Sequence, residues 1–162
     1  MTSIRDIIFI VALLFVVGVS VMFIVKIGHN VNTQLLNVSV FNNSVAASNV
    51  IQHTDMAINS MDYIYLAFFI SFAIGIIIFG YLIGGTPIMT PIYLFILVIF
   101  AFVGVLLQLA WGDIGSSAQL LSTTSNLPIT NFILLHLGYF TVVLGLLGIL
   151  SMYAKPQDQV SY

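Results

Sequence analysis

The residue types that support catalysis or metal binding are few in this chain and lie far apart. Its three histidines are His29, His53 and His136, and it has no cysteine to act as a thiolate nucleophile or metal ligand. His29 and His53 are too far apart for a local metal motif such as two histidines four residues apart. No serine lies in a Gly-x-Ser-x-Gly turn or beside a suitable base. The sequence therefore predicts no catalytic residue, no metal site and no cofactor.

His136 is the one histidine inside an apolar segment, in the stretch LPITNFILLHLG at residues 127–138. If a helix begins near Asn131, His136 lies roughly 8 Å below the start of that helix. Gln108 lies at a similar depth in the preceding apolar segment, and Asp113 lies just above it. A hydrogen bond between Gln108 and His136 would contribute on the order of 0.6 kcal/mol, up to about 2 kcal/mol. We therefore predict a structural interhelical contact, with a proton relay or ligand site as the alternative.

The elements that position these residues follow from the composition. Of 162 residues, 60% are hydrophobic and only 5% are charged, whereas roughly a quarter are charged in a globular protein. The mean hydropathy is +1.18. Three basic and five acidic residues leave no basic patch to neutralise phosphates, so nucleic-acid binding is not expected. The composition predicts an all-α integral membrane protein whose partners are the lipid bilayer and other apolar helices.

Four apolar runs are long enough to cross a bilayer core of roughly 30 Å at about 1.5 Å per residue. The first is expected to be a retained signal anchor, because no small-x-small cleavage site follows it. Gly84 and Gly85 are expected to cap the second helix, and Thr90 and Pro91 to begin the third. We predict a single membrane domain with four transmembrane helices at residues 7–25, 63–83, 92–111 and 131–153.

Two outer segments, residues 28–62 and 112–130, connect these helices. The first has no proline and a single glycine, so it is expected to stay helical apart from a turn at residues 41–44. A short strand at residues 37–41 is the alternative. The second is rich in serine, threonine and glycine, and we predict a loop with a helical turn at residues 118–121.

The end of the first outer segment has the pattern of an amphipathic helix. We expect Asp55, near His53, to lie on its solvated face together with Gln52 and Asn59. The opposite, apolar face would consist of Ala47, Ile51, Ile58 and Met61.

Four crossings would place both chain ends on one side of the membrane. Arg5 and Lys155 lie on that side, and only Lys26 lies on the other. The positive-inside rule therefore favours a cytoplasmic-type side for the termini.

The predicted crossings contain no Asp, Glu, Lys or Arg. Pumps and ion-coupled transporters depend on ionisable groups within the membrane. Glycine or proline breaks near the middle of paired crossings, which mark the unwound helices of many transporters, are also not evident. Both features argue against transport.

Small residues recur at intervals of three and four in the last three predicted crossings. In lipid, such stripes allow helix backbones to approach closely. They predict either packing within one bundle or a seam between copies of the chain in a homo-oligomer. The residues are Ala67, Ser71, Gly75, Ala101, Gly104, Gly138, Thr141, Gly145 and Gly148.

Several stretches carry a resemblance to known proteins. The second crossing opens MDYIYLAFFI, a proline-bounded hairpin follows, and a loop ending LPITNF leads into a last crossing that ends MYAK. Over residues 61–155 the chain resembles small multi-span membrane proteins of tailless icosahedral phages, which enclose a lipid membrane beneath a double-jelly-roll capsid. The resemblance implies a role in the internal membrane of a virion, organising lipid or linking it to the capsid. It transfers no catalytic residue.

Taken together, these features favour a non-enzymatic structural membrane protein of a larger assembly, with other membrane or capsid proteins as partners. An accessory subunit of a membrane enzyme or energy-transducing complex is an alternative, because it would equally lack catalytic residues. A holin-like pore-former is a further alternative, although no crossing shows the polar stripe that a water-filled lumen requires.

Overall fold

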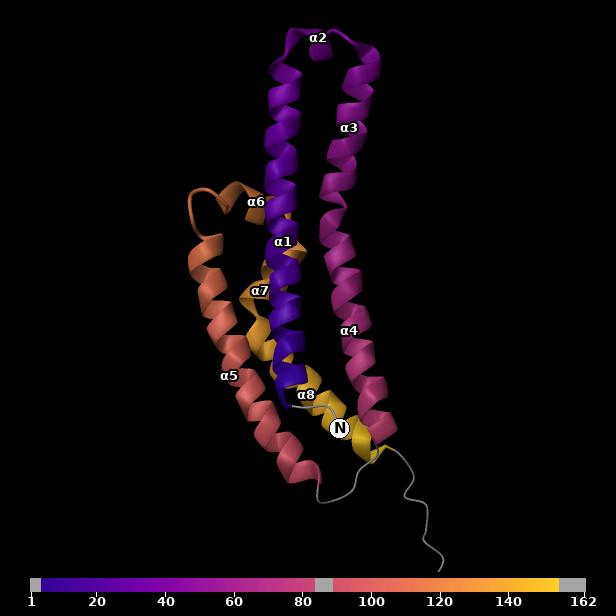
Figure 1. Ribbon diagram of the computed structural model, residues 1–162, viewed down its shortest axis with the longest axis vertical. Coiled ribbons are helices and arrows are strands. Elements are labelled where there is room, and N and C mark those ends of the chain that lie inside the picture. Colours follow the sequence, from indigo (N-terminus) through magenta and orange to yellow (C-terminus); the bar gives the residue numbers. More distant parts are fainter. Residues whose placement is uncertain (1–3, 84–88, 155–162) are drawn as a thin grey trace, which may run out of the picture.

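The computed structural model describes residues 4–83 and 89–154, which are almost entirely helical and contain no strand. An elongated bundle carries a long helical hairpin at one end (Figure 1). The described residues form the helices α1 (Ile4–Asn37), α2 (Ser39–Asn42), α3 (Val45–Asn59), α4 (Met61–Ile83), α5 (Met89–Gly115), α6 (Leu121–Asn126), α7 (Pro128–Leu135) and α8 (Leu137–Tyr153).

Three stretches of these helices are long and apolar enough to cross a membrane: Val11–Leu36, Val45–Leu82 and Pro91–Gly115. Helices α7 and α8 reach the required length only as a pair, and they are bent by 74° at their junction. The described part of the chain thus contains three candidate membrane-crossing helices, or four if α7 and α8 form one crossing. This is consistent with a multi-pass membrane protein.

Helix α1 extends well beyond the thickness of a bilayer core. It has 34 residues and is therefore about 51 Å long, some 20 Å longer than the core. Helix α3 packs antiparallel beside its upper part, and α2 connects the two at the tip (Figure 1). We call residues 27–59 the arm.

The arm confirms the prediction of a helical outer segment, because residues 37–41 form no strand and belong to α1 and α2 except for a bend at Val38. The Ser44 hydroxyl accepts a hydrogen bond from the backbone N–H of Ala47 at 3.4 Å and caps α3 after the tip. Ile51 and Ile58 are buried against α1, as expected for the apolar face of an amphipathic helix.

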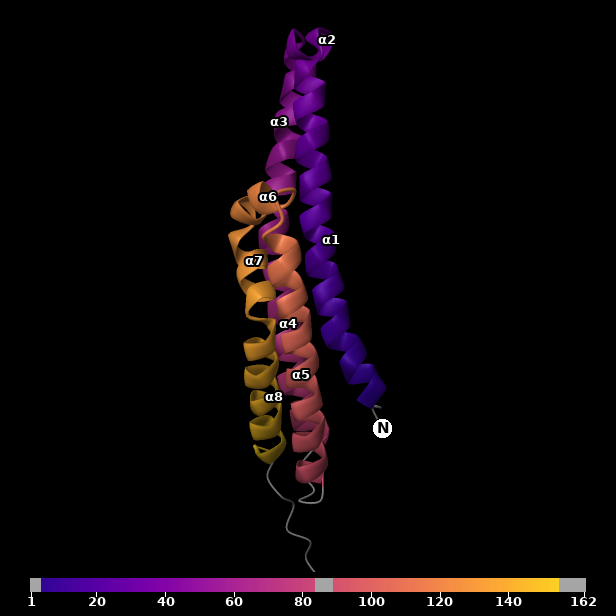
Figure 2. The same ribbon diagram turned by 90° about the vertical axis from the view of Figure 1, so that its left-hand side faces the viewer.

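Below the arm, α4, α5 and α8 run alongside one another, while α1 crosses them at an angle (Figure 2). The best-buried side chains lie where α1, α4, α5 and α7 converge, just under the arm. Met22, Trp111, Leu127 and Leu134 are completely buried there, and the Tyr65 hydroxyl donates to the carbonyl of Leu14 at 3.2 Å.

The prediction of a loop at residues 112–130 is wrong, because most of this segment is helical. Helix α5 continues to Gly115, and α6 begins at Leu121, where only the end of a helical turn was expected. Hydroxyl groups in this segment bond to carbonyls of the preceding turn, so they are satisfied without leaving helical geometry. Examples are Ser116 to Gly112 at 2.7 Å and Ser125 to Ser122 at 2.8 Å.

The fourth predicted crossing is two helices instead of one. The first of them, α7, begins at Pro128, before the predicted start near Asn131. It ends at Leu135, because the backbone of His136 is non-helical at φ −118° and ψ 19°. Residues 84 and 85 lie outside the described residues, and α5 already includes Thr90, which was expected to precede it.

Candidate functional site

Asp62 joins two helices at the base of the arm. It is the second residue of α4 and is buried, with 4% of its surface exposed. Its Oδ1 accepts from both the backbone N–H and the hydroxyl of Thr130, each at 2.7 Å, and its Oδ2 accepts from the N–H of Ile129 at 3.0 Å.

This contact is explained by the start of α7. The first N–H groups of a helix have no partner within it, and the helix dipole favours a negative charge there. Because Pro128 occupies the first position, the next two N–H groups, those of Ile129 and Thr130, are the ones that need acceptors. The Asp62 carboxylate supplies them and fixes α7 to the start of α4.

A second contact fixes α7 to α5. The indole Nε1–H of Trp111 donates to Oδ1 of Asn131 at 2.9 Å, and the Trp111 side chain is completely buried. A buried indole needs such a partner. Asn131 therefore lies beside the end of α5, where the sequence predicted the start of the last crossing.

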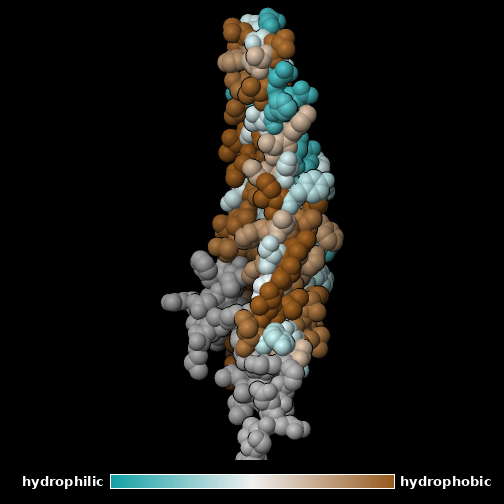
Figure 3. Space-filling model, turned by 90° about the vertical axis from the view of Figure 1, so that its right-hand side faces the viewer, coloured by the Kyte–Doolittle hydropathy of each residue, from teal (hydrophilic) through white to brown (hydrophobic). Residues whose placement is uncertain are grey.

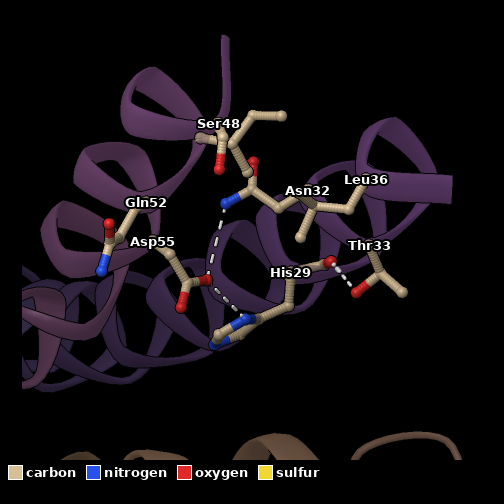
Figure 4. Close-up of a pocket in the computed structure, with 8 residues that line it drawn as sticks. His29, Asn32, Thr33, Leu36, Ser48, Gln52 and Asp55 are labelled. Atoms are coloured by element: carbon tan, nitrogen blue, oxygen red, sulfur yellow. Dashed lines mark hydrogen bonds and ion pairs between the residues drawn. The ribbon is translucent and has the colours of Figure 1, made fainter. Parts of the chain in front are cut away.

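Four polar side chains meet between the two helices of the arm, and we call them the arm cluster: His29, Asn32, Asp55 and Asn59. The Nδ1 of His29 lies 2.9 Å from Oδ1 of Asp55, and its Nε2 lies 3.2 Å from Oδ1 of Asn59. Asn32, which is buried, donates to the same Asp55 oxygen at 3.5 Å. Figure 4 shows His29 and Asp55 pointing toward one another from opposite helices.

The arm cluster borders an open groove of about 480 Å³ between α1 and α3. A protonated His29 can donate from both ring nitrogens to the two oxygens that face it. Nowhere in residues 4–83 and 89–154 do three or more His, Cys, Asp or Glu side chains gather as a metal site would require. The cluster is a set of polar side chains in contact across a helix–helix seam, and such polar contacts fix register.

The position of Asp55 corrects the sequence prediction. It was expected on a solvated face near His53, but it faces α1, while His53 is exposed. Asp55 lies four residues after Ile51 and three before Ile58, and side chains at these spacings share one helix face. The helical repeat therefore contained the signal. Asp62 was missed because its partners are 67 and 68 residues away in the sequence.

The predicted hydrogen bond between Gln108 and His136 is not formed. Gln108 Oε1 accepts from the backbone N–H of Gly138 at 3.2 Å, whereas His136 Nδ1 lies 2.9 Å from the carbonyl of Phe132. The cause is the helix break at His136, which leaves the N–H of Gly138 at the start of α8 without a helical partner. Asp113 is exposed and lies outside this contact.

Most of the small residues on α8 pack within the bundle. A side-chain carbon added to Gly104 would lie 2.9 Å from Thr141 Oγ1 and 3.2 Å from the Cα of Gly138. One added to Gly80 would lie 2.5 Å from the carbonyl oxygen of Gly148. Gly145 approaches Leu97 in the same way, and Ala101 is half-buried.

The small residues on α4 behave differently. Ala67, Ser71 and Gly75 are all exposed, and the space beside Gly75 is open. The hydroxyl of Ser71 donates to the carbonyl of Ala67 at 2.8 Å within the same helix. This stripe therefore takes no part in packing the described bundle.

Together, α7 and α8 cover the same length as α4. At one end, Thr130 meets Asp62 near the start of α4. At the other end, the Ser151 hydroxyl donates to the carbonyl of Ile77 at 2.6 Å. The pair therefore passes along the bundle from one end of α4 nearly to the other.

Comparisons of the chain with protein-family models, with curated proteins and with solved structures find no match.

Proposed function

We propose that the protein is a non-enzymatic structural membrane protein that joins a lipid bilayer to a protein layer in a larger assembly. The resemblance described above supports a virion with an internal membrane, whose capsid would be that layer. The arm is the part of the chain that reaches the capsid.

The proposed topology has four crossings, with the bent pair α7 and α8 acting as the last. If α4 crosses the bilayer, a pair that covers the same length crosses it as well. The arm and α6 then lie on one side, and the start of α1 and the end of α8 lie on the other. The few basic residues favour a cytoplasmic-type side for the chain ends.

The observation that carries the proposal is the arm itself. It extends about 20 Å beyond a bilayer core, and the Asp62 and Trp111 contacts fix its base. Its tip exposes large apolar side chains: 73% of Val40, 40% of Phe41 and 78% of Val45. Large apolar side chains exposed together outside lipid are typical of a site of protein interaction.

Site-specific photocrosslinking in the native particle or membrane tests this proposal. A photoreactive amino acid at Val40 is expected to form adducts with a coat protein. The matched control is Ile78, which is 53% exposed on α4 but lies far from the tip, and it is expected to form adducts only with lipid or membrane proteins. Adducts of Val40 with subunits of an energy-transducing complex alone would refute the proposal and favour the accessory-subunit alternative.

A further inference from the structure

Helix α1 carries a second apolar stripe besides the one that packs against its own bundle. Its positions alternate at intervals of four and three, the spacing of a coiled-coil heptad. We call it the outer stripe: Leu13, Val17, Ser20, Ile24, Ile27, Val31 and Gln34. Ser20 and Gln34 are its polar positions, and Val17 is half-buried because it also packs against the core of its own bundle. In the part of α1 that belongs to the bundle, the other face, with Leu14, Met22 and Val25, is buried.

The outer stripe remains largely exposed in the structure. The exposed fraction is 41% for Leu13, 51% for Ile24, 60% for Ile27 and 47% for Val31. Its lower part faces the region of the bilayer, where exposed apolar side chains need no protein partner. In the proposed topology, on which this inference rests, its upper part lies on the arm, beyond Lys26 and outside the lipid.

On the arm, the exposed surface of α1 is divided into two faces. Asn30, Thr33 and Asn37 are exposed on one side, and Ile27 and Val31 are exposed on the other. Figure 3, which looks onto the arm from the side of α3, shows hydrophobic residues along one edge of the arm and hydrophilic residues along the other. The apolar side is therefore a defined stripe and not a generally apolar surface.

We propose that two copies of this chain pair in parallel through the outer stripes of α1. Within α1, the positions that correspond to a in the heptad are β-branched: Val17, Ile24 and Val31. In parallel coiled coils, β-branched residues at a favour two strands. Two copies inserted in one bilayer in the same orientation also present their stripes in parallel and at the same height.

The charge of the arm permits this self-association. Residues 27–59 contain no Lys, Arg or Glu, and their one acidic residue, Asp55, is paired with His29. Like charges on the two arms therefore do not oppose one another. A partner recognised mainly by charge would find little on the arm to bind.

The area of the stripe indicates where the pairing occurs. A half-exposed aliphatic side chain can bury on the order of 50 Å², so the arm contributes far less than the roughly 800 Å² per partner of a stable soluble complex. Confinement to one bilayer raises the effective concentration of the second copy and fixes its orientation. The pair therefore forms between copies in the same membrane.

The absence of cysteine from the chain allows a direct test by disulfide crosslinking of the full-length protein in lipid vesicles. Ile27→Cys and Val31→Cys lie on the stripe, and Thr33→Cys is the matched exposed control on the polar face. Disulfides require Cα atoms within about 7 Å, so we expect the stripe cysteines to give roughly tenfold more crosslinked dimer than the control. Equal yields at Val31 and Thr33, or no dimer at either stripe position, would overturn the proposal.

A charge in the stripe provides an independent test. Val31→Glu is introduced into the Ile27→Cys chain, with Thr33→Glu as the control. Because Val31 is half-exposed in the single copy, this change leaves the buried seam between α1 and α3 intact. We expect Val31→Glu to lower the dimer yield about tenfold through like-charge repulsion across the seam, and Thr33→Glu to leave it unchanged. An unchanged yield with Val31→Glu contradicts self-pairing, whereas the photocrosslinking of Val40 tests the capsid link separately.

Discussion

At the scale of single residues, the polar groups inside this apolar molecule hold one helix to another. Asp62 and Gln108 both accept hydrogen bonds from N–H groups at helix starts, and Trp111 donates to Asn131. Leaving such groups unpaired away from water costs several kcal/mol in hydrocarbon. The polar side chains therefore help to determine which helices are neighbours and how far each helix is shifted along the bundle relative to the next.

The substitution Asp62→Asn tests the contact between α4 and α7. The amide loses the charge that strengthens three hydrogen bonds, and we expect the free energy of unfolding to fall by about 2 to 4 kcal/mol. The exposed Asp113→Asn is the matched control and should change it by less than about 0.5 kcal/mol. Denaturation of the purified protein in detergent micelles measures both variants. Equal losses of stability would show that Asp62 has no special role.

The substitution Gln108→Leu tests which partner this amide has. Because its oxygen accepts from the N–H of Gly138, we expect a loss of roughly 1 kcal/mol in the same denaturation measurement. His136→Phe removes an imidazole that is bonded only to the carbonyl of its own preceding turn, and it should cost less. A larger loss for His136→Phe than for Gln108→Leu would contradict the observed pairing.

At the scale of elements, the close approach of backbones explains the course of α8. Gly80 on α4 and Gly104 on α5 leave room for α8 to pass between these two helices, and Gly138 and Gly148 do so on α8 itself. In lipid, this contact replaces the hydrophobic effect as the source of helix association.

A pair of glycine substitutions on α4 separates helix packing from helix propensity. Gly80→Ala places a methyl group against the carbonyl of Gly148, and overpacking of this kind costs about 1 to 3 kcal/mol. Gly75→Ala meets open space, so we expect it to be neutral or to stabilise by up to about 1 kcal/mol. Thermal unfolding in micelles compares the stability of the two variants, and we expect Gly80→Ala to be the less stable. If Gly75→Ala were the less stable variant, α8 would not pack against Gly80.

The sequence predicted the elements that depend on local patterns. Apolar length identified α1, α4 and α5, and the repeat of Ile51 and Ile58 identified α3. The helix break at His136 was not predictable in the same way. It is stabilised by Gln108, which accepts a hydrogen bond from the N–H of Gly138, 30 residues away in the sequence. The extra helix α6 was missed because its serines and threonines are also typical of loops.

At the scale of the whole molecule, one long helix links the bundle to the arm. The core under the arm is built from α1, α4, α5 and α7, so the arm and the start of α7 are anchored at the same place. A bilayer on one side and a protein layer on the other would then be held at a distance set by the length of α1.

We propose that the bundle crosses the membrane four times, with the arm and the chain ends on opposite sides. Three single-cysteine chains, Val40→Cys, Ser122→Cys and Ala154→Cys, report the side of the arm tip, of α6 and of the end of α8. With a membrane-impermeant maleimide on oriented vesicles, we expect Val40 and Ser122 to be labelled from the same side, and Ala154 only from the opposite side. Labelling of all three from one side would make α7 and α8 a re-entrant pair and would contradict the four-crossing topology.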